Sequence, residues 1–178
     1  MKAPVWILAL VLAVPAVAED KKDDKKDDKG KKGPEKPGSP EDLTKQAAAK
    51  EAAGDLEGAA ELMAKVAATS ATGEPGLKLG RLLEAKGDLD RAMDAYKGAA
   101  EKLTGATKGE ALGRLAVVQE IRGDAAAGAT AEAAAAADAT GLWPTIALSR
   151  ARASAGKGDE AVALAQKAEA TNEGTTTT

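Results

Sequence analysis

The sequence contains no cysteine, no histidine and no phenylalanine, and only one tyrosine and two tryptophans in 178 residues. Without cysteine the chain can form neither disulfide bonds nor thiolate metal sites. Without histidine it lacks the commonest general base and the commonest metal ligand. The net charge of −3 argues against a generally basic surface for nucleic acid. We therefore expect no enzyme activity, no catalytic residues, no cofactor, no metal site and no nucleic-acid partner.

The apolar residues that are present are mainly small. They make up 44% of the chain, and most of them are alanine, leucine and valine. A small side chain removes little area from water, so such a core needs many closely packed elements. The chain also lacks the aromatic and β-branched runs that strands favour. The composition therefore predicts an all-α fold.

The first 18 residues have the organisation of a secretory signal peptide. Lys2 supplies a positive start, Val5 to Val14 form an unbroken apolar run, and residues 15–18 form a small-residue ending. An uncleaved anchor is the alternative, but the apolar stretch from Ala3 to Ala18 is shorter than the ~20 residues that a membrane-spanning helix needs. We predict cleavage after Ala18, no stable membrane insertion afterwards, and export by a bacterium to the periplasm or the exterior.

Residues 19–40 differ sharply from the leader. Pairs of lysines alternate with pairs of aspartates, and glycines and prolines follow. Mixed charge without apolar residues cannot form a core, so we predict a disordered linker. The alternatives are a loose divalent-cation site at the aspartate pairs and a surface tether at the lysine pairs. No glycine-fixed ligand geometry accompanies the aspartates, so we favour a solvated spacer.

A Gly-Asp pair recurs where the helical pattern breaks. It stands at residues 54–55, 87–88 and 123–124, and a longer version, Gly-Lys-Gly-Asp, stands at 156–159. Glycine can end a helix in the left-handed conformation, and aspartate can cap the next helix. The first glycines are 33, 36 and 33 residues apart, which is room for two helices and two turns. The period predicts four helical hairpins, or about eight antiparallel helices.

One hairpin carries a fuller pattern of small and large residues between Gly73 and Ala106. Its marked positions are Leu79-Gly80, Leu83, Gly87, Ala92, Tyr96 and Ala99. The first hairpin keeps Gly54, Ala59 and Met63, and the fourth keeps Gly156, Ala161, Ala165 and Ala168. The third has Gly128 and Glu132 at the small and aromatic positions. This spacing resembles the tetratricopeptide repeat (TPR), whose paired helices approach most closely at the small residues.

The resemblance implies an α-α superhelix, a TPR-like right-handed solenoid, over residues 41–172, with residues 173–178 as a disordered tail. A generic alanine-rich helical bundle is the alternative. Tyr96, at the aromatic position of its repeat, is expected in the core.

In TPR arrays the first helix of each repeat lines a concave groove, so the resemblance implies partner contacts on these helices. The candidate partner-binding residues are Lys78, Arg81, Glu84, Arg114, Glu120, Trp143 and Arg150. The three arginines could bind a partner's carboxylates or could form ion pairs within the protein. We interpret Trp143 as a cover for the seam between the third and fourth repeats rather than as an anchor for a partner.

Together these patterns predict a non-catalytic, exported TPR adaptor or scaffold that binds a protein or peptide partner in its groove. The alternative is a structural or self-associating spacer of the cell envelope. In that case the alanine-rich segment Ala125–Ala139 would make helix–helix contacts with another copy. The polar group Ser149, Arg150, Arg152 and Ser154 is interpreted as solvated helix surface, because no second element converges on it.

Overall fold

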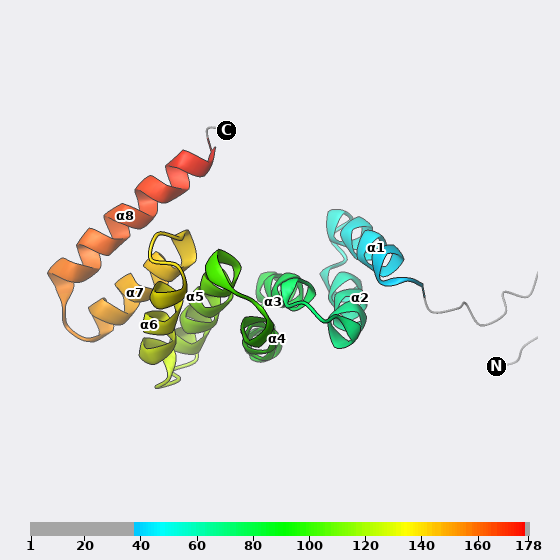
Figure 1. Cartoon of the computed structure of the whole chain (residues 1–178), viewed down its shortest axis with the longest axis horizontal. Coiled ribbons are helices and arrows are strands. Elements are labelled where there is room, and N and C mark those ends of the chain that lie inside the picture. Colours follow the sequence, from blue (N-terminus) through cyan, green and yellow to red (C-terminus); the bar gives the residue numbers. More distant parts are fainter. Residues whose placement is uncertain (1–37, 177–178) are drawn as a thin grey trace, which may run out of the picture. The chain divides into compact units, whose positions relative to one another are not determined.

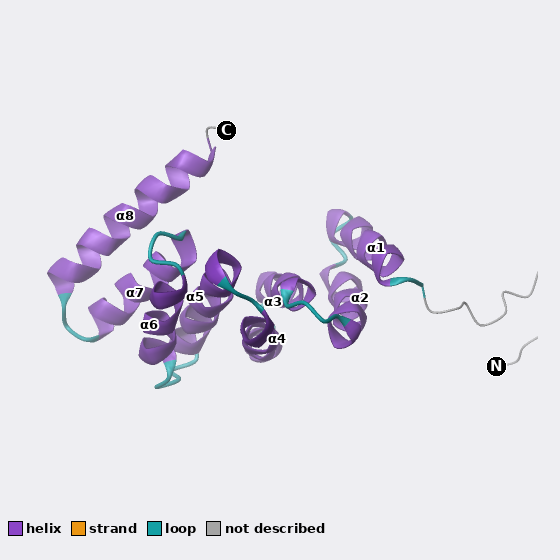
Figure 2. Ribbon diagram, in the orientation of Figure 1, coloured by secondary structure: helices purple, strands orange, loops and turns teal. Residues whose placement is uncertain are grey.

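The computed structural model describes residues 38–176, so the expected signal peptide and most of the expected linker lie outside the described residues. Within that range the chain forms eight helices and no strands. Figure 1 labels the helices along the chain, and Figure 2 shows the loops that connect them. The helices are α1 (Pro40–Ala52), α2 (Leu56–Thr69), α3 (Glu74–Lys86), α4 (Leu89–Lys102), α5 (Gly105–Ile121), α6 (Ala127–Ala137), α7 (Leu142–Ser154) and α8 (Gly158–Thr176). The prediction of an all-α fold of helical hairpins is confirmed.

The predicted glycine turns end the first helix of every hairpin. Gly54, Gly87, Gly123 and Gly156 all have positive φ, between 72° and 85°. In the first two hairpins the following aspartate also caps the next helix. Asp55 accepts the backbone N–H of Gly58 at 2.9 Å, and Asp88 accepts that of Arg91 at 3.4 Å.

The capping prediction is wrong for the other two hairpins. Asp124 accepts the N–H of Ala126 at 2.8 Å inside the turn, and α6 begins only at Ala127. The helix is therefore shorter than the predicted segment Ala125–Ala139. In the fourth hairpin Lys157 stands at the position of Asp88, because α8 begins at Gly158, and Asp159 lies in the first turn of α8. There the negative charge of Asp159 interacts favourably with the positive end of the α8 dipole, but Asp159 is not the N-cap residue of the helix.

The longer step of 36 residues, from Gly87 to Gly123, has its origin in α5, which has 17 residues where α3 has 13. The surplus is about one helical turn. The same helix packs on α7 as well as on α4 and α6. A Cβ atom on Gly113 would lie 2.5 Å from the carbonyl carbon of Trp143, so glycine is what lets the two backbones approach. Gly109 makes a similar approach to Asp138, because a Cβ atom added to Gly109 would lie 2.6 Å from the Cβ of Asp138.

Each helix packs on the next one along the chain, and the core lies between them. It consists largely of alanine, with a few large side chains. The largest fully buried side chains include Tyr96, Met63, Leu83 and Val118. Tyr96 has no exposed surface, which confirms its predicted place in the core.

At the C-terminal end, α8 continues to Thr176. The structure thus describes residues 173–176 as helix, within the range that the sequence analysis assigned to a disordered tail. No helix among the described residues is both long enough and apolar enough to cross a membrane.

Candidate binding surface

Ion pairs link the first helices of successive hairpins. Lys78 on α3 reaches Glu51 on α1, with 3.5 Å between Nζ and Oε2. Arg81 on α3 makes a bidentate pair with Glu110 on α5, at 2.9 and 2.5 Å. We call the face of α1, α3, α5 and α7 that carries these pairs the first-helix surface. Because the partners lie on different hairpins, each pair also connects two repeats.

The same surface continues to α7. Arg150 on α7 pairs with Glu120 on α5 through its Nε. Glu84 on α3 accepts a hydrogen bond from Arg114 on α5 at 2.9 Å. All seven predicted contact residues thus lie on the helices expected to carry them. That they bind a partner remains a prediction.

Arg114 is at the centre of this network. Besides Glu84 it binds Glu110, one turn earlier on α5, at 2.9 Å, and its guanidinium carbon lies 3.8 Å from the centre of the Trp143 ring. Its side chain is only 17% exposed, whereas those of Arg81 and Arg150 are 46% and 45% exposed. Arg114 and Trp143 therefore join three helices in the interior, while Arg81 and Arg150 present charge to solvent.

Burial and charge together shift the pKa values in the network. Partial burial raises the pKa of Glu110, but hydrogen bonds from Arg81 and Arg114 outweigh it and bring the pKa below 4.5. Burial and the hydrogen bond that its hydroxyl donates to Glu84 both raise the pKa of Tyr96. Burial lowers the pKa of Arg114, but its hydrogen bonds to Glu110 and Glu84 and the nearby charges raise it overall. The network therefore favours the ionised forms of Glu110 and Arg114.

The lowered pKa of Glu110 predicts a loss of stability in acid. The ion pairs of this carboxylate contribute fully above its unfolded-state pKa of about 4.5 and disappear as the pH falls through the lower folded-state pKa. We therefore expect Glu110→Gln to be less stable than the wild type at pH 7, and the difference to shrink towards pH 3. Urea unfolding at both pH values measures it. Glu101→Gln, at an exposed glutamate of α4, is the matched control, and a gap independent of pH would contradict the assignment.

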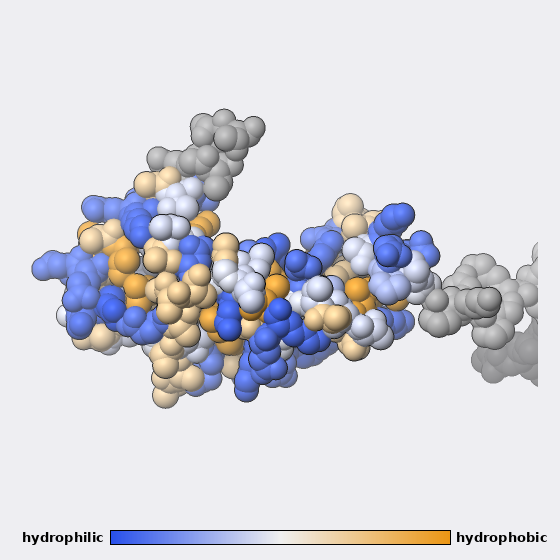
Figure 3. All heavy atoms as spheres, viewed as in Figure 1, coloured by the Kyte–Doolittle hydropathy of each residue, from blue (hydrophilic) through white to orange (hydrophobic). Residues whose placement is uncertain are grey.

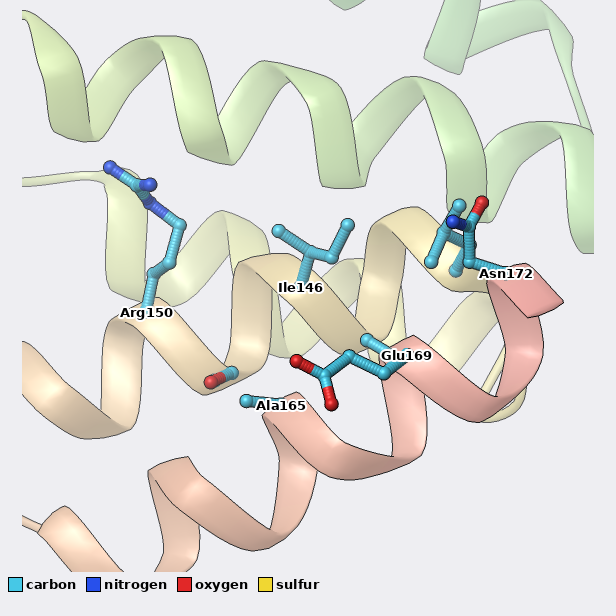
Figure 4. Close-up of a pocket in the computed structure, with 8 residues that line it drawn as sticks. Ile146, Arg150, Ala165, Glu169 and Asn172 are labelled. Atoms are coloured by element: carbon cyan, nitrogen blue, oxygen red, sulfur yellow. The ribbon is translucent and has the colours of Figure 1, made fainter.

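Three hollows border the first-helix surface. A pocket of about 440 Å³ lies between α7 and α8, and Figure 4 shows Ile146 and Arg150 on one side of it and Ala165 and Glu169 on the other. A second, of about 290 Å³, lies between α5, α7 and the start of α6 and includes Glu120 and Arg150. A third, of about 210 Å³, includes Glu110 and Trp143. The visible face in Figure 3 mixes hydrophilic and smaller hydrophobic areas.

The described residues contain no group of three or more acidic side chains placed to hold a metal ion. The polar group at the end of α7 is used in contacts within the chain. The hydroxyl of Ser149 donates to the carbonyl oxygen of Ala161 at 2.8 Å, and Arg152 pairs with Glu132 at 2.5 Å and with Glu160 at 3.0 Å. These contacts join α7 to α6 and α8.

Gly113 was not among the residues predicted to matter from the sequence, although the signal for it exists. Leu112-Gly113 repeats the pair Leu79-Gly80 after 33 residues. Its glycine lies at the contact between α5 and α7. Glu51 and Glu169 were also not predicted as members of this surface or its pockets.

The successive helical hairpins, with ion pairs between their first helices, define a TPR-like helical repeat protein with the α-α superhelix fold. Solved structures agree. The crystal structure of MamA is 21% identical with a TM-score of 0.62, covering 80% of this chain and 83% of that chain. YrrB, described as a TPR protein with an unusual peptide-binding site, is 16% identical with a TM-score of 0.56, covering 74% and 68%.

The nearly identical TPR-like repeats of a kinesin light chain from Podosopora anserina are 20% identical to this chain, with a TM-score of 0.57, covering 78% of this chain and 77% of that one. Neither the protein-family models nor the curated proteins match the sequence. At these identities the likeness establishes the fold, which is the TPR-like architecture that the sequence predicted.

Proposed function

We propose that this protein is a non-catalytic, exported scaffold that binds a protein or peptide partner on its first-helix surface. The observation that carries the proposal is that the side chains of Arg81 and Arg150 are held by ion pairs and still exposed to solvent. Each guanidinium is held in place by a glutamate of α5, yet nearly half of each side chain remains exposed. Arginines fixed in this way are prepared for a ligand at little cost in side-chain entropy.

Both arginines retain hydrogen-bond donors for a partner. Arg81 uses Nε and one terminal nitrogen for Glu110, and Arg150 uses Nε for Glu120. Their remaining terminal nitrogens have no partner among the described residues. A partner with acidic side chains could therefore add charge-assisted hydrogen bonds without breaking the existing pairs. Arg114, which is mostly buried and stacked on Trp143, would support the surface rather than contact the partner.

Export rests on the leader-like residues 1–18, which precede the described part of the chain. The charged segment that follows would hold the helical repeats away from a wall or membrane. N-terminal sequencing of the protein from the envelope or medium tests this proposal. A mature chain that begins at Glu19 is the expected result, and an intact Met1 would contradict it.

Affinity capture from the envelope fraction, followed by mass spectrometry, tests the binding function. We expect a partner whose affinity falls about tenfold or more with each of Arg81→Ala and Arg150→Ala, because hydrogen bonds to charged groups contribute about 1.5–3 kcal/mol. Arg91→Ala is the matched control, since Arg91 is an exposed, ion-paired arginine on a second helix, α4. Equal binding by all three variants would contradict the proposal. Recovery of only further copies of this chain would favour the self-associating spacer.

A further inference from the structure

The pocket between α7 and α8 lies at a position that is filled in the second repeat. The turn glycines Gly87 and Gly156 are 69 residues apart, and this offset aligns the two hairpins. The offset pairs each residue of the second hairpin with a pocket residue of the fourth: Leu77 with Ile146, Gly80 with Ser149, Arg81 with Arg150, Tyr96 with Ala165, and Ala99 with Ala168. Both hairpins thus have an arginine beside the position of Tyr96 and Ala165, but only the second hairpin has an aromatic ring there.

In the second hairpin Tyr96 fills the space between the two helices. Its ring lies directly against Gly80, where an added Cβ would be 2.9 Å from Cζ and closer still to two other ring atoms. The first hairpin is filled as well, since Met63 takes the aromatic position and is buried together with Ala47. Large side chains at this position therefore close the gap between paired helices.

In the fourth hairpin the position holds Ala165, which is exposed. Ser149, at the place of Gly80, turns its hydroxyl to the backbone of α8 instead of contacting a ring. The result is the pocket of about 440 Å³, with Leu142, Ile146 and Ala168 among its apolar residues. An apolar cavity of about 150 Å³ is enough to bind benzene, so this pocket has room for an aromatic side chain and part of its backbone.

The remaining lining residues argue against a further helical repeat as the occupant. The 69-residue offset places Glu169 and Asn172 on Ala100 and Leu103, which are only 5% and 6% exposed. A helix packed on α8 as α5 packs on α4 would have to cover these polar side chains. A polar outer face of this kind is typical of the terminal repeat of a solenoid. A single inserted side chain covers less of α8 than a whole helix would. In Figure 4 the carboxylate of Glu169 extends towards Ala165, and Asn172 lies at the far end of the pocket from Arg150.

We propose that the pocket between α7 and α8 binds an aromatic side chain, tyrosine or phenylalanine, from the partner's chain, in the position that Tyr96 occupies within the second repeat. This inference rests on the proposed scaffold function and specifies the partner's chemistry. Arg150 belongs to both sites, so the aromatic residue lies beside the acidic group that Arg150 binds.

The test uses p-cresol, the side chain of tyrosine, as the probe. In the full chain with labelled methyl groups, NMR titration is expected to shift the signals of Ile146, Ala165 and Ala168. Ala165→Phe supplies the missing ring from within. It should raise the unfolding temperature by roughly 3 °C or more and abolish the p-cresol shifts. Ala163→Phe, at an exposed alanine of α8 outside the pocket, is the control that should do neither.

Ala165→Met, which copies the first repeat, provides a second filled pocket in case the phenylalanine variant does not fold. The absence of shifts in the wild type, equal shifts in the filled variants, or equal shifts with cyclohexanol would each overturn the proposal. Retention of the captured partner by the filled variants would also overturn it and leave the scaffold function standing. Failure to capture any partner would count against the scaffold function. The p-cresol titration reports on the pocket alone, so the two proposals can fail separately.

Discussion

Tyr96→Ala is expected to lower the free energy of unfolding by about 3–5 kcal/mol, the usual cost of removing a large buried aromatic side chain. Tyr96 has no exposed surface, and its ring lies against Gly80, which is too small to close the resulting cavity. The core cluster that contains Tyr96 includes several alanines, whose short side chains cannot move into the gap. Urea or thermal unfolding followed by circular dichroism measures the effect.

Tyr96→Phe separates packing from hydrogen bonding at the same position. It keeps the ring and removes only the hydroxyl that donates to Glu84. We expect a loss of about 1–2 kcal/mol, because a buried hydrogen bond to a charged group is lost. If the alanine variant were no less stable than the phenylalanine variant, the ring would not be supporting the hairpin.

Gly113→Ala is the second substitution with a large expected effect, a loss of about 1–3 kcal/mol from overpacking. The new Cβ would lie 2.5 Å from the carbonyl carbon and 2.7 Å from the carbonyl oxygen of Trp143. These are backbone atoms, so no rotamer change can relieve the contact, and α5 and α7 would have to separate. Unfolding midpoints measure the loss, and Trp143 fluorescence reports on the local displacement.

Gly98→Ala is the matched control for Gly113→Ala. Gly98 lies within α4, and nothing comes within 4 Å of a Cβ atom built on it. Alanine should therefore stabilise α4 by about 0.5–1 kcal/mol through helix propensity. Opposite signs for the two substitutions are the expected result. A stabilising Gly113→Ala would show that the α5–α7 contact is looser than the structure indicates.

The sequence was sufficient to predict the hairpins because their turns depend on local chemistry. Gly54 and Gly87 adopt positive φ, and Asp55 and Asp88 cap the helices that follow them. Tyr96 could be placed in the core because it is the one large aromatic residue at the position that the repeat pattern reserves for one. These inferences required only neighbouring residues and a period.

The third repeat was harder to predict because no sequence motif marks the extra turn of its first helix. Leu112-Gly113 keeps the 33-residue period, whereas Gly123 does not, so the surplus lies between them. Only the fold shows that this glycine contacts Trp143. The ion pairs between first helices were also out of reach, since Arg81 has several glutamates at similar sequence distance and the helix register selects Glu110.

The ion pairs between successive first helices have a consequence for the mechanics of the array. They are partly exposed to solvent, and each one spans a joint between hairpins rather than the inside of a hairpin. At physiological ionic strength mobile ions screen exposed charges over about 8 Å, and concentrated salt shortens that range further. Concentrated salt would thus weaken the contacts between hairpins more than the packing inside each hairpin, so that a repeat array of this kind bends more easily at high ionic strength than at low ionic strength.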